Sequence, residues 1–305
     1  MIEFESVGKT YRAFVGRAGA RALDQLSLVV KAGEVMGIAG PNGAGKSTLI
    51  SILLGYLRPT DGAVRIAGLA PRAYVERHGV GYLSELVDVP ARWTVGDALE
   101  RYAVLAGVRD GAIPLRVDEI VERLGLDDHR DKPVKALSKG NRQRLGLAQS
   151  LLRGERVFVL DEPTHGLDPL WTTRFREIVA ALKHPNRAIV IASHNLEELE
   201  RLCDRVAILD RGHLQRVVEV TRILPMTAAV VYRFTVARGA EHLDTVFPGA
   251  VDLGRGDWAV RADDLASLNR GVAELIARGT LLAGVAPAQS ALEQQFQEAI
   301  GEVVL

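Results

Sequence analysis

A glycine-rich loop between two apolar segments is the feature that most narrows the possible folds of this 305-residue chain. The loop reads Gly40-Pro-Asn-Gly-Ala-Gly-Lys-Ser47. Residues 34–39 before it have the short apolar composition of a buried strand, and residues 47–54 after it suit a helix with one apolar face. A strand, a glycine-rich loop and a helix in this order are the setting of the P-loop motif. The sequence therefore predicts an α/β fold with a phosphate-binding loop.

Each residue type in this loop has a chemical reason. Glycines let backbone N–H groups turn inward around phosphate oxygens, and the positive end of the following helix points at them. Lys46 is expected to reach the β- and γ-phosphates, and the Ser47 hydroxyl is expected to ligate Mg²⁺. The predicted nucleotide contacts are Gly40, Pro41, Asn42, Gly43, Ala44, Gly45, Lys46, Ser47 and Thr48.

Two carboxylates follow a second apolar segment, residues 157–160. Asp161 and Glu162 stand at its carboxyl end, where open α/β sheets bind their ligands. Asp161 is expected to hold Mg²⁺, directly or through water. Glu162 points the other way on a strand and is expected to polarise an attacking water. By itself, this pattern is common among α/β proteins.

A third motif lies between the first two, at residues 137–144. Ser138 and Gly140 open a predicted helix over residues 141–152, which gives the chain a second helix N-terminus able to bind an anion. One triphosphate does not need two such sites in the same subunit, so the simplest interpretation is that the second serves a nucleotide bound to another copy. The segment alone would more often be an ordinary serine-capped helix.

The order of these motifs resembles that of the nucleotide-binding subunit of ATP-binding cassette (ABC) transporters. Over about residues 1–214 the chain carries, in that family's order, a P-loop or Walker A motif, a signature motif, a Walker B strand, a D-loop at residues 166–168 and a switch histidine, His194. The resemblance implies ATP and Mg²⁺ as cofactors and an ATPase activity with Glu162 and His194 as catalytic residues. It also implies that the signature contacts the partner's ATP through Leu137, Ser138, Lys139, Gly140 and Asn141.

Further roles follow from the same resemblance. Tyr11 matches the aromatic residue that stacks on adenine, although a lone tyrosine in an early strand more often packs in a core. His194 matches the residue that contacts the γ-phosphate, although a lone histidine is more often structural. Asp168 would bridge the two subunits. His165 and His184 have no family role and are interpreted as structural.

Two positions depart from the common family pattern. Glu85 occupies the place of the Q-loop glutamine after the apolar segment 79–83, and a carboxylate can ligate Mg²⁺ as an amide does. The expected metal ligands are therefore Ser47, Glu85 and Asp161. Lys139 adds a positive charge to the signature, near a phosphate. Both variants resemble those of bacterial export subunits that pair with a separate permease chain.

The expected architecture is a P-loop NTPase of the ABC ATPase type with a helical subdomain at about residues 86–150 and a small antiparallel β subdomain. A linker is predicted over residues 215–226, and an accessory α+β domain over residues 227–305. The accessory domain shows the element order β-α-β-β-α-β of a ferredoxin-like unit. Its second helix is expected to be capped by Asp263, and a capping box at residues 290–293 is expected to open a final helix to residue 300.

Composition excludes several classes of protein. The chain has 38 basic and 38 acidic residues, which argues against attachment to nucleic acid by bulk charge. The single cysteine excludes an internal disulfide framework. The longest uncharged run, residues 279–292, is too short for a membrane span. The expected location is therefore the cytoplasm, with peripheral attachment to the inner face of the cell membrane through a permease.

The sequence favours an ATPase subunit that forms a homodimer or heterodimer around two ATP molecules and powers export through a separate permease. The alternative is a soluble ABC ATPase that acts on ribosomes or DNA. Relatives of that kind usually carry two cassettes or a long coiled coil between the motifs, whereas this chain has one P-loop and about 90 residues between Ser47 and Ser138. A P-loop kinase or GTPase is disfavoured by the signature segment and by the lack of an Asn-Lys-x-Asp guanine-binding motif.

Overall fold

The computed structural model describes residues 1–12, 19–220 and 230–301. The chain divides into two compact units, and the first of them ends at Val220. Each unit has its own apolar core, so each is described by itself. No helix in the described ranges combines the length and the apolar character that crossing a bilayer requires.

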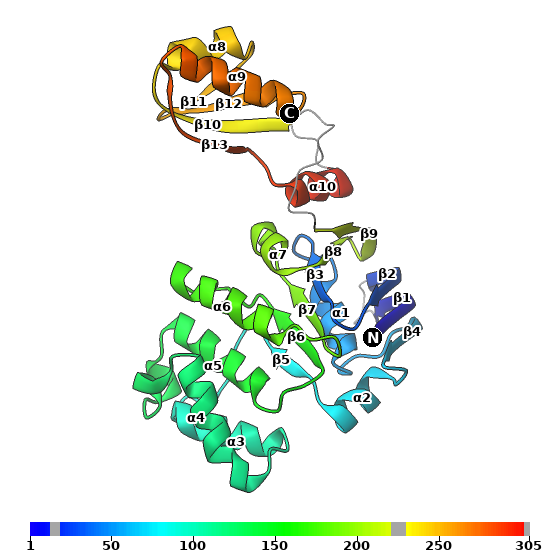
Figure 1. Ribbon diagram of the computed structural model, residues 1–305. Coiled ribbons are helices and arrows are strands. Elements are labelled where there is room, and N and C mark those ends of the chain that lie inside the picture. Colours follow the sequence, from blue (N-terminus) through cyan, green and yellow to red (C-terminus); the bar gives the residue numbers. More distant parts are fainter. Residues whose placement is uncertain (13–18, 221–229, 302–305) are drawn as a thin grey trace. The chain divides into compact units, whose positions relative to one another are not determined.

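A six-stranded sheet of order β5-β6-β7-β3-β8-β9 forms the centre of the first unit (Figure 1). The first five strands in this order are parallel, and β9 pairs antiparallel with β8. All residues of β3 and β7 are buried, as expected for central parallel strands covered on both faces. The strand bounds are β3 Val35–Ala39, β5 Gly81–Leu83, β6 Val157–Asp161, β7 Ala188–Ala192, β8 Arg205–Asp210 and β9 His213–Glu219.

A three-stranded antiparallel sheet accompanies the central sheet. It has the order β2-β1-β4, with bounds Ile2–Tyr11 for β1, Ala20–Val30 for β2 and Asp61–Ile66 for β4. Helix α1, Lys46–Leu53, buries Leu49 and Leu53 in a core shared by both sheets. The predicted antiparallel β subdomain is therefore present, and the helix that follows the P-loop packs between the two sheets.

The other helices of the first unit pack on one another or on the strands of the two sheets. Helices α3, α4 and α5 pack against one another, and α5 also packs against β5 (Figure 1). Thr94 caps α3 through a capping box with Asp97, and Ser138 caps α5. The bounds are α2 Pro71–His78, α3 Val95–Leu105, α4 Ile113–Arg123, α5 Lys139–Leu151, α6 Pro169–Leu182 and α7 Leu196–Leu202, with 3₁₀ turns at Asp110–Ala112, Asp127–His129 and Val134–Ala136.

The second unit is a four-stranded antiparallel sheet of order β11-β12-β10-β13 with two helices on one face. In chain order its strands are arranged 4-1-3-2, which is the ferredoxin-like arrangement predicted from the sequence. Its core includes Phe234, Leu243, Val260 and Leu275, all fully buried. The bounds are β10 Val230–Arg238, a 3₁₀ turn at Ala240–His242, α8 Leu243–Val246, β11 Val251–Gly254, β12 Asp257–Ala262, α9 Leu265–Ala277, β13 Leu281–Pro287 and α10 Ala291–Ile300.

Two expectations need correction, and one capping prediction is confirmed. Residues 215–219, predicted as the start of a linker, form the end of β9, because this segment pairs with β8 and buries Val218. Residues 221–226 of that predicted linker lie outside the described residues. Asp264, not Asp263, caps α9 through a capping box with Ser267. The capping box of Ser290 and Glu293 is present as predicted.

Candidate functional site

The glycine-rich loop folds tightly between β3 and α1. A Cβ atom at Gly40 would lie 2.4 Å from the carbonyl oxygen of Leu209, and one at Gly45 would lie 2.6 Å from that of Ala22. Gly45, the N-cap of α1, also has a φ of 107°, which residues with a side chain rarely adopt. These two glycines are therefore required by close packing as well as by the turn.

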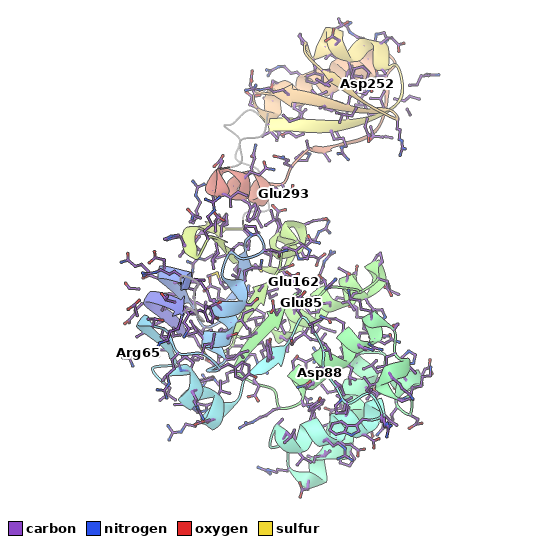
Figure 2. All side chains as sticks on the ribbon, turned by 180° about the vertical axis from the view of Figure 1, so that it is seen from behind. Arg65, Glu85, Asp88, Glu162, Asp252 and Glu293 are labelled. Carbon is purple, nitrogen blue, oxygen red and sulfur yellow. The ribbon has the colours of Figure 1, made fainter. Side chains whose placement is uncertain are left out.

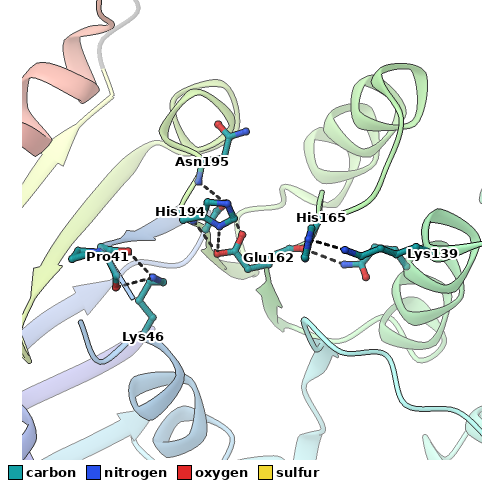
Figure 3. Close-up of polar contacts among 10 residues, drawn as sticks. Pro41, Lys46, Lys139, Glu162, His165, His194 and Asn195 are labelled. Carbon is teal, nitrogen blue, oxygen red and sulfur yellow. Dashed lines mark hydrogen bonds and ion pairs between the residues drawn. The ribbon is translucent and has the colours of Figure 1, made fainter. Parts of the chain in front are cut away.

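Lys46 crosses the loop from the first turn of α1. Its Nζ donates to the carbonyl oxygens of Gly40 at 2.6 Å and Pro41 at 3.3 Å (Figure 3). Burial lowers the pKa of Lys46, and the negative charges of Glu162 and Asp161 oppose this shift. The N-terminus of α1 has no side-chain cap and no acidic residue in its first turn, so its N–H groups remain open to an anion.

The loop forms one wall of a cavity of about 650 Å³, a volume suited to a nucleotide. Tyr11, at the end of β1, lies at its rim, 41% exposed, with its hydroxyl 3.2 Å from Oγ1 of Thr48. The cavity brings together most of the predicted site. Its lining comprises Tyr11, Ala20, Ala22, the residues from Pro41 to Thr48, Glu85, Asp161, Glu162 and His194.

Three carboxylates share this cavity with Lys46. Asp161 ends β6, Glu162 follows it, and Glu85 lies just after β5; Figure 2 labels Glu85 and Glu162 near each other. Burial, helped by the charges of Glu162 and Glu85, raises the pKa of Asp161 to about 6, and Lys46 opposes the shift. The cavity therefore carries an excess of negative charge that a cation would relieve.

The donor set of the cavity fits Mg²⁺ bound together with a nucleotide. The Ser47 hydroxyl and the carboxylates of Asp161 and Glu85 are hard oxygen ligands, which this ion prefers. Within the described ranges, no three His, Cys, Asp or Glu side chains are grouped so that they could hold a metal by themselves. Phosphate oxygens and water would therefore complete the coordination.

Glu162 is fixed by contacts from several directions. Its φ is 46°, a left-handed conformation that costs about 1–3 kcal/mol for a residue with a side chain. Its backbone N–H donates to Ala192 at 2.8 Å. One carboxylate oxygen accepts from the Ser193 hydroxyl at 3.1 Å, and the other accepts from the His194 N–H at 2.9 Å and lies 2.8 Å from Nδ1 of His194 (Figure 3). Ser193 was not predicted from the sequence.

The signature residues do not line this cavity. Ser138 caps α5 and accepts the N–H of Asn141 at 3.2 Å. Asp168 caps α6 and accepts the N–H of Trp171 at 2.9 Å, and its side chain is exposed. The chain thus presents a second helix N-terminus, and the D-loop carboxylate, away from its own P-loop.

Two contacts between α5 and the segment after Glu162 were missed from the sequence. Lys139 Nζ lies 2.8 Å from Nε2 of His165, a residue interpreted as merely structural. Gln143, 5% exposed, donates to the carbonyl oxygens of Glu162 and Pro163, both at 3.2 Å. The available signal was the spacing of Lys139 and Gln143, which lie four residues apart and therefore on one helix face.

Comparison with known sequences places the first unit in a family. A family model described as ABC transporter matches residues 23–165. The ABC transporter ATP-binding protein YhcH of Bacillus subtilis (strain 168) is 36% identical over 216 residues, covering 70% of this chain and 68% of YhcH. The methionine import ATP-binding protein MetN of Caulobacter vibrioides is 38% identical over 230 residues, covering 72% of this chain and 66% of MetN.

Comparison with solved structures agrees on the fold. The ATP-binding cassette MJ0796, solved as a dimer in a post-hydrolysis state with ADP and Pi, matches with a TM-score of 0.66. The match covers 73% of this chain and 100% of that structure at 22% identity, and it therefore speaks for the fold alone. Taken together with the sequence matches, the chain belongs to the ABC transporter family of ATP-binding proteins, as an ATPase subunit of an ABC transporter.

Proposed function

We propose that this chain binds Mg²⁺ and ATP in the cavity around Lys46 and, as a dimer, encloses two ATP molecules. Each ATP would lie between Lys46 of one copy and Ser138 of the other. The observation that carries this proposal is the separation of the two helix N-termini: α1 opens into the cavity, and α5 opens elsewhere. A second anion-binding terminus outside the cavity is best used by a second copy.

Within the cavity, the chain's residues divide the chemistry of hydrolysis. Lys46 and the N–H groups of α1 would hold the β- and γ-phosphates, and Ser47, Glu85 and Asp161 would hold Mg²⁺, which neutralises phosphate charge when bound. Glu162 would accept a proton from the water whose oxygen attacks the γ-phosphorus, while the bond to the bridging oxygen of ADP breaks. His194, beside Glu162, would orient that water and contact the γ-phosphate, and Tyr11 would stack on adenine.

The partner proposed for this dimer is a separate membrane permease, which would hold the ATPase at the inner face of the cell membrane. ATP-binding subunits of this family pair with such chains. We propose export as the direction, supported by the resemblance of Glu85 and Lys139 to the corresponding residues of export-type subunits. The relative from Caulobacter is named for methionine import, so the direction requires its own experiment.

Light scattering of the Glu162→Gln variant tests the dimer. The glutamine amide keeps the shape of the carboxylate but cannot accept a proton, so bound ATP should persist without being hydrolysed. The molar mass of the protein should therefore double when Mg²⁺ and ATP are added. Glu177→Gln, an exposed carboxylate on α6, is the matched control and should remain monomeric while it turns ATP over. A Glu162→Gln protein that stays monomeric at saturating ATP would overturn the dimer.

Purification of the tagged chain from native membranes tests the partner and the direction. A co-purifying chain with several apolar runs of about 20 residues supports the transport function, whereas ribosomal proteins or DNA in its place would support the alternative. In inside-out vesicles of the complex, external ATP should drive accumulation of a compound in the lumen, which corresponds to export. ATP-driven loss of a compound from the lumen would instead show import.

A further inference from the structure

The signature helix α5 contacts the segment that runs from Glu162 to the D-loop through side chains on two successive turns. On the first turn, Lys139 Nζ lies 2.8 Å from Nε2 of His165. On the second, the amide of Gln143 donates to the carbonyl oxygens of Glu162 and Pro163 (Figure 3). An ammonium group can only donate, so the imidazole nitrogen of His165 accepts. Helix α5 therefore bonds this segment at two places: the backbone at Glu162 and Pro163, and the side chain of His165.

The stem of Lys139 adds a steric contact. A Cβ atom at Gly166 would lie 2.9 Å from both Cγ and Cδ of Lys139, and one at Gly140 would lie 2.9 Å from the carbonyl oxygen of Gly166. The φ of Gly166 is 83°, so its backbone conformation also favours glycine. The start of α5 and the start of the D-loop thus touch with no room for a side chain between them.

A third contact lies beyond the D-loop. The guanidinium of Arg144 stacks over the ring of Trp171 at 4.1 Å from its centroid, and Trp171 lies in the first turn of α6. Arg144 also donates to the carbonyl oxygens of Leu124 and Gly125, so its own position is fixed. Helix α5 therefore contacts residues before and after Asp168 and is expected to move together with this segment.

From these contacts we propose that Lys139 is a positioning residue that acts through His165. It couples the signature, which faces the partner's ATP, to the D-loop and to Glu162 of its own subunit. This inference rests on the proposed dimer. Lys139 and His165 are exposed in the single chain, and closure of a dimer would remove water from their hydrogen bond and strengthen it. The contact therefore acts mainly in the ATP-bound dimer.

The competing role for Lys139 is a direct contact between its ammonium and a phosphate of the partner's ATP. The two roles differ in their dependence on His165. A direct contact with phosphate does not need His165. Coupling through the hydrogen bond, in contrast, is lost completely when either the donor on Lys139 or the acceptor on His165 is removed. A double-mutant cycle separates them.

The cycle is measured in the Glu162→Gln background, as the ATP concentration at which half of the protein is dimeric. Lys139→Met keeps the apolar stem over Gly166 and removes the ammonium, and His165→Leu removes the acceptor. Each should raise that concentration by about fivefold, the ratio for one hydrogen bond of typical strength. The double variant should raise it no further. His165→Gln restores an acceptor and should recover most of the effect.

Lys135→Met makes the same substitution four residues earlier, outside these contacts, and should leave the midpoint unchanged. Binding of labelled ATP by the monomer checks that each variant is folded, because every P-loop is intact. If the parent dimerises and the effects of Lys139→Met and His165→Leu multiply, Lys139 acts directly on phosphate and the coupling is wrong. A parent that never dimerises with ATP would overturn the proposed dimer, and the coupling with it.

Discussion

Nδ1 of His194 lies 2.8 Å from Oε1 of Glu162, and the backbone N–H of His194 donates to the same oxygen at 2.9 Å. The Ser193 hydroxyl holds the other oxygen at 3.1 Å. Both carboxylate oxygens are thus already bonded to the turn that follows β7. The general base and the switch histidine that we propose therefore form one hydrogen-bonded unit. A shift of the turn after β7 is expected to move the Glu162 carboxylate with it.

Glu162→Gln should bind ATP as the native chain does while turnover falls by about 10²-fold or more, because the amide cannot accept the proton of the attacking water. The amide can still accept from His194 and donate to Ser193, so the local fold is retained. Phosphate release and labelled-ATP binding measure the two effects. Loss of binding together with turnover would mean that Glu162 has a folding role.

Ser193→Ala should lower kcat by about five- to tenfold and leave KM nearly unchanged. It removes the buried hydroxyl that orients Glu162 and touches no expected nucleotide contact. Steady-state ATPase assays give both constants. Ser193→Thr keeps the hydroxyl and is the matched control; an equal loss of activity in both variants would show that packing, not the hydrogen bond, is responsible.

Glu85→Gln should bind metal-free ATP about threefold more tightly than the native chain, and should bind ATP with Mg²⁺ equally or more weakly. Without the ion, the Glu85 carboxylate repels the triphosphate. With the ion bound, Mg²⁺ attracts this carboxylate more strongly than the phosphates repel it. Solvent partly screens these groups, so the differences in binding free energy are below about 1 kcal/mol. Titration of labelled ATP with Mg²⁺ and with EDTA measures both. The same change in ATP affinity with Mg²⁺ and with EDTA would show that Glu85 does not bind the metal.

The stability of the nucleotide-free chain should depend on pH through Asp161. Its pKa, raised by burial to about 6, lies above the ordinary 3.8, so the folded state holds this proton more tightly than the unfolded state. Its contribution to stability is therefore complete below about pH 4 and is lost as the pH rises through 6. Asp161→Asn avoids that loss.

Unfolding of the first unit by urea at several pH values checks this prediction. The advantage of Asp161→Asn should be absent near pH 4, grow up to about pH 6 and level off on the order of 1–2 kcal/mol, because Asp161 is half-buried and solvent screens part of the shift. Mg²⁺ with ATP should abolish the advantage by stabilising the native carboxylate. An advantage of constant size across the pH range would assign it to packing instead.

The local parts of the fold and site were accessible from the sequence because neighbouring residues determine them. The loop ending in Ser47, the strand ending in Asp161 and the ferredoxin-like element order each follow from short-range patterns. Ala20 and Ala22 were missed, although they line the cavity, because β2 reaches it from a different sheet and nothing in its own composition marks that approach. The pairing of Lys139 with His165 was missed for the same reason: 26 residues separate them.

The last residues of β9 show a different limit. Residues 215–219 carry no strong strand pattern of their own, and their conformation comes from pairing with β8 across the turn at residues 211–212. Asp263 and Asp264 are equivalent as cap candidates in composition, and only the backbone geometry of the turn selects Asp264. Tertiary pairing therefore decided the conformation of β9, and local backbone geometry decided the cap of α9.

The left-handed backbone at Glu162 affects which substitutions selection for heat resistance would favour at this position. Glycine or asparagine would relieve that conformation at position 162, so a screen that rewards only a higher melting temperature should enrich them where this relief exceeds the loss of the contacts with Ser193 and His194. Every such winner would lack the carboxylate proposed to activate water. A thermostable lineage of this ATPase can therefore keep its turnover only by gaining its stability elsewhere in the chain.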